Sequence, residues 1–498
     1  MSDVETYEGR SIRTSWAQGF SIAALAVIAV IGFGLRIHRL GDECIWLDEV
    51  VSYPYLDLPT LGAYLEEVRS HDPPMSPLYF TIQYYWARVV GDSVIAVRLL
   101  SIVFGLASIV LVYVLGVVLY NRGAGLIAAL CTAMAIPHVY YAQEIRVYAL
   151  LQCLALGSML TLVLALRRGG RRWWIAHAVC NALILTTHLF GVLLIAAQGF
   201  YLIAVHGRHW RMWLGWGCAH VMMLAPFLVR VNRLRGDALD QAISFIPEPS
   251  LRWLLNTYCV YYPGVEAWGR RLHAVGPVVG VVAVLAVTGM AAIWFDRRSP
   301  EKSFQERDTF LLLALWFLLP PLLLFMLSYA VTPSFVERYT LYSSFALYLM
   351  AGGALALPGR SWWTGLVLVG IGCGYAWAWN DVDRPFRLNY RKAAIVLEGT
   401  SRPDELIVGW KEVRASLLNP HMGIPVDERF RHGETIKEVL GVLEGATAEG
   451  RSVWAVVYDG PGGDPRRELE SALRNRQIRY HRTDIGGLRQ LYIYHVMR

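Results

Sequence analysis

The amino-acid sequence predicts a polytopic α-helical membrane protein that ends in a small α/β domain. Of its 498 residues, 55% are hydrophobic and only 17% are charged, whereas roughly a quarter of the residues of a soluble domain are charged. Apolar runs recur along the chain as far as residue 380, while residues 381–498 are rich in charge and contain no such run.

A membrane-spanning helix needs about 20 mostly apolar residues, and about eleven segments qualify. We expect them at residues 17–37, 97–119, 123–140, 144–166, 173–189, 190–205, 212–230, 273–295, 309–330, 336–357 and 361–379. The first should be a retained helix, since no small-residue cleavage site accompanies it. Segment 77–90 is apolar but short and rich in Tyr and Trp, which favours a helix lying at the membrane interface.

The links between these segments predict the orientation. If segment 77–90 lies flat, the basic links all fall on one side, together with Arg10 and Arg13: residues 120–122, 167–172, 206–211, 295–308 and 358–360. The positive-inside rule assigns that side to the cytoplasm. We therefore expect a multi-pass protein of the inner (plasma) membrane with a cytoplasmic N-terminus. No nucleic-acid partner is expected despite the net charge of +7, because no basic face interleaves with aromatic residues.

Two domains follow from this reading. Residues 1–380 form the membrane domain, whose outer loop 38–96 carries the interfacial helix. Residues 381–498 form a soluble extracytoplasmic α/β domain. There we expect buried strands at 405–410 and 452–458, amphipathic helices at 435–443 and 466–476, and a closing strand at 487–496.

Adjacent carboxylates open the outer loop. Asp48 and Glu49 follow the first apolar run and lie between Trp46 and Tyr53. Partial desolvation at a lipid-water boundary raises the pKa of a carboxyl group, so either residue could act as a general base. A solvated acidic loop is the alternative.

A rigid turn follows in the same loop. His71 and Asp72 stand directly before Pro73 and Pro74. The prolines restrict the backbone, so both side chains would be mounted rigidly, as a substrate-binding site requires. The alternative is a purely structural turn into the interfacial helix.

Charged residues also occur between two predicted spans. Glu144 and Arg146 precede Tyr148 with no room for a true loop. An ionisable group at membrane depth costs on the order of 2.5–3.5 kcal/mol, which argues for side chains that are paired or face a ligand. A Glu to Arg pair that only locks two helices is the alternative.

A second arginine lies late in the chain. Arg338 and Tyr339 open a span on the outer face. Two guanidinium groups facing one cavity suit a phosphate, which arginine binds in a bidentate manner. Arg338 could instead extend to the lipid headgroups. His188 ends another span on the same face and could bind substrate or only pack between helices.

Taken together, these motifs resemble the GT-C glycosyltransferases of the protein O-mannosyltransferase-like superfamily, which includes the bacterial lipid A aminoarabinose transferases. The resemblance rests on LDE at 47–49, HDPPMSPLYF at 71–80, VRLLSIVFG at 97–105, YYAQEIRVYAL at 140–150 and ERYTLY at 337–342. It covers residues 17 to about 380 in order and spacing.

The resemblance implies an inverting transferase that moves a hexose or pentose from a polyprenyl phosphate to a glycolipid, glycan or protein. It assigns catalysis to Asp48, with Glu49 beside it. The aminoarabinose transferases carry a lysine immediately before these prolines. A phosphate-binding lysine is therefore missing here, so Arg146 and Arg338 would bind the phosphate. His71, Asp72, Glu144, Tyr148, Tyr339 and His188 would contact substrate. We expect no essential metal, with a divalent cation between carboxylates as the alternative.

A lipid-linked sugar flippase or transporter is the competing function. Such proteins show related halves and charged sites near the bilayer midplane. This sequence shows no repeat, and its charges gather at one surface. A scaffold that binds partners through residues 381–498 is a third alternative.

Overall fold

The computed structural model describes residues 2–42, 44–72, 75–208, 210–220, 246, 248–260, 300–356, 389–410, 413, 415–419, 422, 426–433, 435–458, 465–485 and 491–497. The chain forms two compact units, residues 1–38 with 55–379 and residues 39–54 with 380–498. The second unit thus includes a stretch of the predicted outer loop 38–96. The division at residue 380 stays a prediction, since residues 357–388 lie outside the described part.

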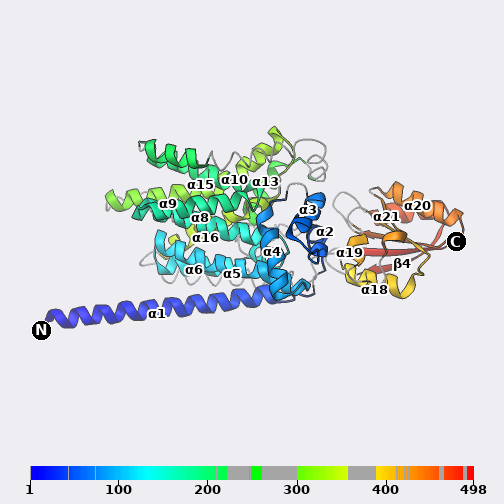
Figure 1. Cartoon of the computed structure of the whole chain (residues 1–498), viewed down its shortest axis with the longest axis horizontal. Coiled ribbons are helices and arrows are strands. Elements are labelled where there is room, and N and C mark those ends of the chain that lie inside the picture. Colours follow the sequence, from blue (N-terminus) through cyan, green and yellow to red (C-terminus); the bar gives the residue numbers. More distant parts are fainter. Residues whose placement is uncertain are drawn as a thin grey trace. The chain divides into compact units, whose positions relative to one another are not determined.

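The first unit is helical wherever it has described secondary structure (Figure 1). Its elements are α1 (Ser2–Ile37), α3 (Leu61–His71), α4 (Pro77–Val90), α5 (Val94–Leu119), α6 (Arg122–Met134), α7 (Ile136–Ala142), α8 (Tyr148–Arg168), α9 (Arg171–Leu185), η2 (Leu189–Gly191), α10 (Val192–His206), α13 (Leu251–Val260), α15 (Pro300–Ala330), η3 (Glu337–Ser343) and α16 (Ser344–Leu355).

Among the described residues, five helices are long and apolar enough to cross a membrane: Gln18–Ile37, Val94–Leu119, Tyr148–Arg168, Leu189–His206 and Arg307–Ala330. They match five of the expected spans. Helices α6 and α7, bent by 60° at the break between them, count as a sixth if they form one broken span. The full number of eleven spans stays a prediction.

Two expected spans differ from continuous long helices. The segment predicted at 336–357 consists of the 3-10 helix η3 followed by α16, and Thr340 within η3 departs from helical geometry. Helix α9 has only 15 residues, fewer than the about 20 that a membrane span needs. The spans expected at 273–295 and 361–379, and most of 212–230, lie outside the described residues.

Helix α4 begins and ends where the interfacial helix was predicted, at Pro77 and Val90. Proline suits the first turn of a helix because no backbone N–H is needed there. The indole of Trp86 donates a hydrogen bond of 2.8 Å to the carbonyl of Ala96, which ties α4 to the start of α5. Its position at the interface stays a prediction.

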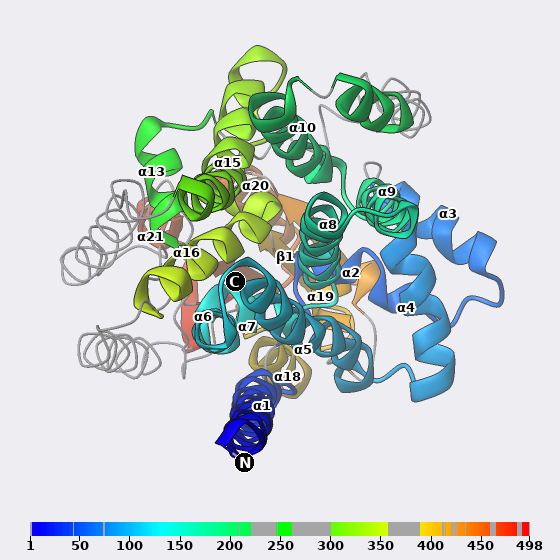
Figure 2. The same ribbon diagram turned by 90° about the vertical axis from the view of Figure 1, so that its left-hand side faces the viewer.

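Helix α8 lies in the interior of the first unit, as the end-on view in Figure 2 shows. It contacts α5, α7, α9 and η3. Of its most apolar stretch of 18 residues, 67% is buried, the largest share among the candidate spans. Its first residue, Tyr148, is itself buried. The start of α8 is therefore a well-anchored place for a functional side chain.

A buried polar network joins α8, α9, α10 and the helical residues 210–220. Asn181 of α9 is at its centre. It accepts a hydrogen bond of 2.6 Å from Ser158 and donates one of 3.0 Å to Gln198. His177, His220 and Trp216 extend it. Because buried polar groups need partners, the network fixes how these helices face one another.

The second unit contains a five-stranded mixed sheet in the order β2-β1-β3-β5-β4. Its elements are α2 (Leu47–Val50), η1 (Tyr53–Tyr55, which ends at the unit boundary), α18 (Tyr390–Thr400), β1 (Leu406–Trp410), α19 (Ala415–Leu418), η5 (Asp427–Arg429), β2 (Phe430–Gly433), α20 (Ile436–Ala448), β3 (Val453–Tyr458), α21 (Pro465–Asn475), β4 (Arg479–Ile485) and β5 (Leu491–Met497). Strand β3 is buried throughout. It pairs with β1 in parallel and with β5 antiparallel.

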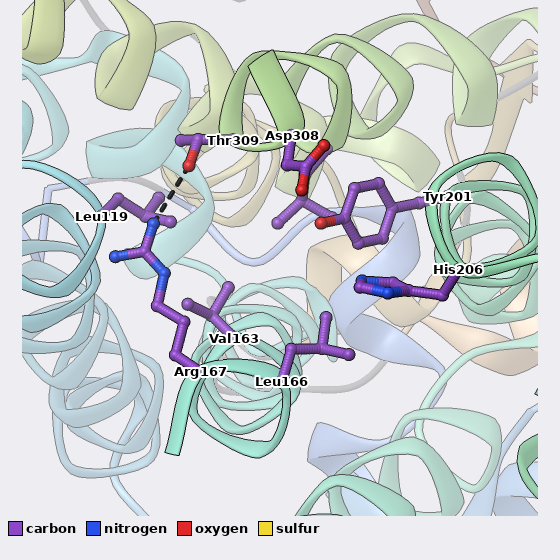
Figure 3. Close-up of a pocket in the computed structure, with 9 residues that line it drawn as sticks. Leu119, Val163, Leu166, Arg167, Tyr201, His206, Asp308 and Thr309 are labelled. Atoms are coloured by element: carbon purple, nitrogen blue, oxygen red, sulfur yellow. Dashed lines mark hydrogen bonds between the residues drawn. The ribbon is translucent and has the colours of Figure 1, made fainter. Parts of the chain in front are cut away.

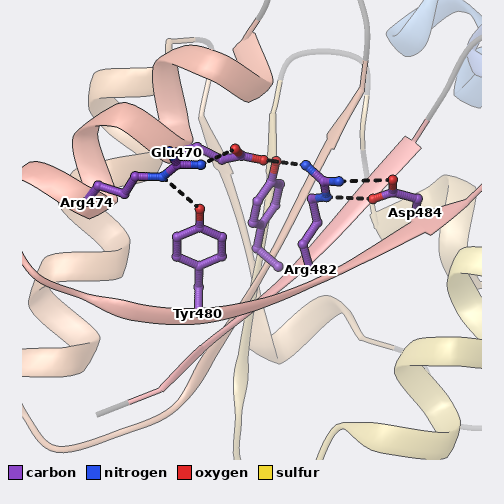
Figure 4. A network of polar contacts seen from close by, with 6 residues as sticks. Glu470, Arg474, Tyr480, Arg482 and Asp484 are labelled. Carbon is purple, nitrogen blue, oxygen red and sulfur yellow. Dashed lines mark hydrogen bonds and ion pairs between the residues drawn. The ribbon is translucent and has the colours of Figure 1, made fainter.

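A charged network ties α21 to the edge strand β4 and its neighbour β5 (Figure 4). Glu470 accepts hydrogen bonds from Arg482 at 2.7 Å and from Tyr494 at 3.1 Å. Burial acts to raise the pKa of Glu470, but the bonds from Arg482 and Tyr494, with the charge of Arg474, outweigh burial and lower this pKa below its ordinary value. The carboxylate therefore stabilises the folded unit in its ionised form.

Replacing Glu470 by Gln is expected to destabilise β4 and β5 by about 1–2 kcal/mol, a value discounted for the partial exposure of Arg482. A lowered pKa adds stability above the unfolded value and loses it as the pH falls through the folded value. The difference in stability between the wild type and Glu470→Gln should therefore shrink below about pH 4.5. Hydrogen exchange of β4 and β5 in the full chain measures this difference. The exposed Glu468→Gln is the control, and equal exchange in both variants would contradict the expectation.

Candidate active site

Four ring-bearing side chains gather around Arg338 at one end of the first unit. Tyr148 is the first residue of α8, His188 precedes η2, Phe190 lies within η2, and Tyr339 follows Arg338 in η3. These elements are far apart in sequence, but η2 and η3 contact each other and η3 contacts α8. The structure thus brings together four predicted site residues, Tyr148, His188, Arg338 and Tyr339.

The rings of this group pack closely. The Tyr339 ring lies 4.9 Å from the His188 ring and 5.2 Å from the Phe190 ring, with which it is stacked. The Tyr148 and Tyr339 ring centroids are 6.4 Å apart. His188 is held in place because its Nδ1 accepts a hydrogen bond from the backbone of Phe190 at 3.2 Å. His188 therefore has a local structural role as well as a place in the group.

Arg338 is oriented by this aromatic group. Its Nε donates a hydrogen bond of 2.8 Å to the hydroxyl of Tyr148. The guanidinium carbon lies 5.7 Å from the centre of the Tyr148 ring and 5.5 Å from that of Tyr339. Cations near aromatic faces are stabilised by about 0.5–2 kcal/mol. Tyr148 and Tyr339 thus orient the guanidinium.

Arg146 is paired with Asp72. Its Nη1 lies 3.1 Å from Asp72 Oδ2, and the two side chains are only 13% and 18% exposed. Asp72 directly follows α3, whereas Arg146 lies in the non-helical residues 143–147 before α8. The ion pair, which is largely shielded from solvent, fixes the direction of both side chains. Two predicted site residues that are 74 positions apart therefore meet.

Glu144 is fully buried in the same short linker. Its backbone carbonyl accepts a 2.6 Å hydrogen bond from Ser101 of α5. Nearby, the amide of Gln143 donates to the carbonyls of Arg36 and His38. These bonds hold the linker against neighbouring helices, so its charged side chains have fixed positions.

His71 is oriented differently from its neighbour Asp72. Its ring stacks on Tyr55 at 5.1 Å, and its Nε2 lies 3.1 Å from the Tyr55 hydroxyl. Its Nδ1 faces the carbonyl of Glu67 and the hydroxyl of Ser70. Burial and the charge of Glu67 raise the pKa of Tyr55. A contact between His71 and substrate stays a prediction.

Asp48 and Glu49 belong to the second unit, where the short helix α2 contacts α19. Glu49 is completely buried, whereas Asp48 is partly exposed. Only a group that solvent or a ligand can reach can exchange a proton with a substrate. Of the two acids, Asp48 is the better placed for that role.

Sequence reasoning passed over two completely buried arginines, Arg36 in α1 and Arg98 in α5. Arg98 lies inside the apolar helix α5 and is completely buried. The motif at 97–105 contains it, and its position within an apolar helix could have drawn attention, because buried arginine is costly unless it has partners. No sequence motif named Phe190 or Trp253, whose indole donates a hydrogen bond of 3.2 Å to Glu337.

The arrangement of possible metal ligands bears on the expected absence of an essential metal. In the described part of the chain, no three side chains of His, Cys, Asp or Glu come together to hold an ion. Metal dependence therefore stays a prediction of the sequence.

Comparisons with known proteins support this reading of the fold. Residues 71–231 match the family model described as dolichyl-phosphate-mannose-protein mannosyltransferase. That segment contains Asp72, Glu144, Arg146, Tyr148 and His188. No curated protein sequence is similar enough to the chain to be matched.

Solved structures match over most of the chain. ArnT from Cupriavidus metallidurans in the apo state has a TM-score of 0.57 at 12% identity, covering 96% of this chain and 98% of that one. The same protein bound to undecaprenyl phosphate gives 0.55 at 13% identity and the same coverage. The apo oligosaccharyltransferase of Archaeoglobus fulgidus gives 0.53 at 13% identity, covering 93% and 69%. The chain therefore has the GT-C membrane fold, and its resemblance to the GT-C glycosyltransferases of the protein O-mannosyltransferase-like superfamily is confirmed.

Proposed function

We propose that the chain is an inverting glycosyltransferase. It moves a hexose or pentose from a polyprenyl-phosphate donor to a hydroxyl group of a glycolipid, glycan or protein on the outer face of the membrane. Two proteins of the same fold support the donor class. ArnT has a structure bound to undecaprenyl phosphate, and the archaeal AglB has one with a dolichol-phosphate.

The observation that carries the proposal is the orientation of Arg338 by Tyr148 among the aromatic side chains around it. Guanidinium groups bind phosphate in a planar, bidentate manner. Aromatic faces beside the cation suit the apolar face of a sugar ring or an isoprenoid chain. In our proposal Arg338 binds the donor phosphate, while Tyr148, Tyr339 and His188 contact the donor.

Arg146 contributes in a second way. The carboxylate of Asp72 offsets its positive charge and directs its guanidinium, so Arg146 attracts phosphate less strongly than its charge alone suggests. We assign it the role of a second phosphate contact, held by Asp72. Glu144, fixed in the same linker, and His71 at the end of α3 are proposed substrate contacts.

The reaction is a single displacement. The acceptor oxygen forms a bond to the anomeric carbon as the bond between that carbon and the phosphate oxygen breaks. Asp48 takes the proton of the acceptor hydroxyl, with Glu49 beside it, and the bonding electrons leave with polyprenyl phosphate. Arg146 and Arg338 stabilise the charge that develops on this leaving group. Attack from the opposite face inverts the anomeric configuration.

In our proposal the protein lies in the inner membrane. Its N-terminus is in the cytoplasm, and its C-terminal domain is extracytoplasmic. The ends of α5, α8 and α10 and the start of α15 line one cavity, so the basic links that adjoin them lie at one end of the first unit. This agrees with the positive-inside rule for a cytoplasmic end.

The purified full-length protein in lipid nanodiscs should release polyprenyl phosphate from a matching polyprenyl-phosphate sugar when an envelope fraction supplies acceptors. The product should carry the sugar in the inverted anomeric configuration, as NMR can determine. A flippase would instead move the labelled lipid across a liposome membrane without releasing its phosphate, and a scaffold would do neither. Transbilayer movement without release across a panel of sugars would refute the proposal.

A further inference from the structure

A polar cavity lies at the other end of α8 from Tyr148 and Arg338. It has a volume of about 110 Å³, several times the roughly 10–15 Å³ that one water molecule needs. The C-terminal parts of α5, α8 and α10 and residues 308–312 of α15 form it (Figure 3). Nothing in the proposed transfer reaction uses this cavity.

Arg167, near the end of α8, provides the positive charge of the cavity. One Nη donates a hydrogen bond of 3.0 Å to Thr309 Oγ1, and the other donates to the carbonyl of Val118. A guanidinium has five N–H groups, so these two bonds orient the fork and leave donors for a ligand. A fork fixed in this way suits the oxygens of a phosphate.

Asp308, at the start of the span in α15, provides a negative charge in the same cavity. Within the described chain it makes no hydrogen bond and no ion pair, and its electrostatic neighbours are His206 and Tyr201. It is not paired with Arg167, although both line the cavity. Figure 3 shows Asp308 beside Tyr201, and Arg167 directed at Thr309. Two opposite charges are thus kept apart within one cavity.

His206 also lines the cavity, and the remaining walls are apolar. They consist of Leu119, Val163, Leu166 and Leu312. A simple anion would be repelled by Asp308, and a simple cation by Arg167. A ligand that carries both charges a few bonds apart, together with a hydrocarbon part, complements Arg167, Asp308 and the apolar side chains.

We propose that this cavity binds the headgroup of a zwitterionic phospholipid with a primary ammonium group, of the phosphatidylethanolamine class. Arg167 and Thr309 hold the phosphate, and Asp308 accepts hydrogen bonds from the ammonium group with Tyr201 beside it. The glycerol end lies along the leucine side chains. A quaternary choline headgroup has no N–H to donate, and a glycerol headgroup has no positive charge for Asp308. Phosphatidylethanolamine should therefore be preferred to both.

Native mass spectrometry of the delipidated full-length protein in detergent tests this preference. Titration with phosphatidylethanolamine should give at least about fivefold tighter binding than phosphatidylglycerol or phosphatidylcholine, which corresponds to about 1 kcal/mol. Asp308→Asn should remove the preference for phosphatidylethanolamine but leave the binding of phosphatidylglycerol unchanged. Arg167→Gln should weaken the binding of all three lipids. Arg168→Gln, which changes the neighbouring exposed arginine, is the matched control and should behave as the wild type.

Soluble phosphoethanolamine is the second arm of the experiment. Weak binding of this headgroup, with tight binding of the intact lipid, supports a membrane lipid as the ligand. Equal binding of the two would overturn the lipid assignment. Equal binding of the three lipids to the wild type, or a preference that survives Asp308→Asn in a folded variant, would overturn the site. These readouts do not involve sugar transfer, so they are independent of the proposed function.

Discussion

Asp48→Asn is expected to abolish sugar transfer while the protein stays folded and still binds its donor. Asn has the size of Asp but cannot take a proton, and a general base accounts for about 10²–10⁴ in rate. We therefore expect the turnover of a polyprenyl-phosphate sugar to fall at least about 100-fold. Partial exposure of Asp48 makes a large effect on stability unexpected. The rate of polyprenyl phosphate release and the melting temperature measure the two effects.

Two companion variants make this result specific. Asp57→Asn changes an exposed carboxylate in the following loop, and its rate should match that of the wild type. Glu49→Gln changes a completely buried acid, so it should lower the melting temperature more than Asp48→Asn does. Transfer that survives Asp48→Asn within a few-fold would remove Asp48 from the mechanism.

Arg338→Gln is expected to weaken donor binding by about 10-fold to 100-fold, because a hydrogen bond to a charged group contributes about 1.5–3 kcal/mol. Tyr148→Phe should have a smaller effect in the same direction, since it removes only the hydroxyl that accepts from Nε. The affinity for polyprenyl phosphate, measured by calorimetry in detergent, reports both effects directly.

The exposed Arg252, at the start of α13, provides the control for these variants. Arg252→Gln removes the same positive charge as Arg338→Gln, but Arg252 lies outside the aromatic group. This variant should therefore leave the donor affinity unchanged. If Arg338→Gln matches this control while the protein stays folded, phosphate recognition must be assigned to other residues.

Patterns local in sequence predicted much of the fold. Helix α4 was predicted at 77–90 and occupies Pro77–Val90, because proline and the flanking loop residues mark both ends. Strands β1 and β3 were predicted because buried strands consist of continuous apolar residues. Strand β4 was missed. It lies at the edge of the sheet, and its polar sequence from Arg479 to Asp484 lacks an apolar pattern.

The candidate site was less predictable because its contacts join distant segments. The motifs named Asp72, Arg146, Tyr148 and Arg338, but no local signal indicated that Arg146 pairs with Asp72. Nor did the sequence indicate that residues 39–54 group with the C-terminal domain. There the thiol of Cys44 contacts Asn389 and Arg391, over 340 positions away. Pairings of this kind depend on the folded arrangement rather than on periodicity.

The polar network around Asn181 makes the stability of α9 depend on its neighbour. Helix α9 has only 15 residues and buries His177 and Asn181, so by itself it would enter a bilayer poorly. Ser158 of α8 supplies a partner for both, and only the turn at Gly169 and Gly170 separates the two helices. The buried polar groups of α9 therefore gain this partner only when α9 packs against α8, so the two helices form one helical hairpin whose stability depends on both.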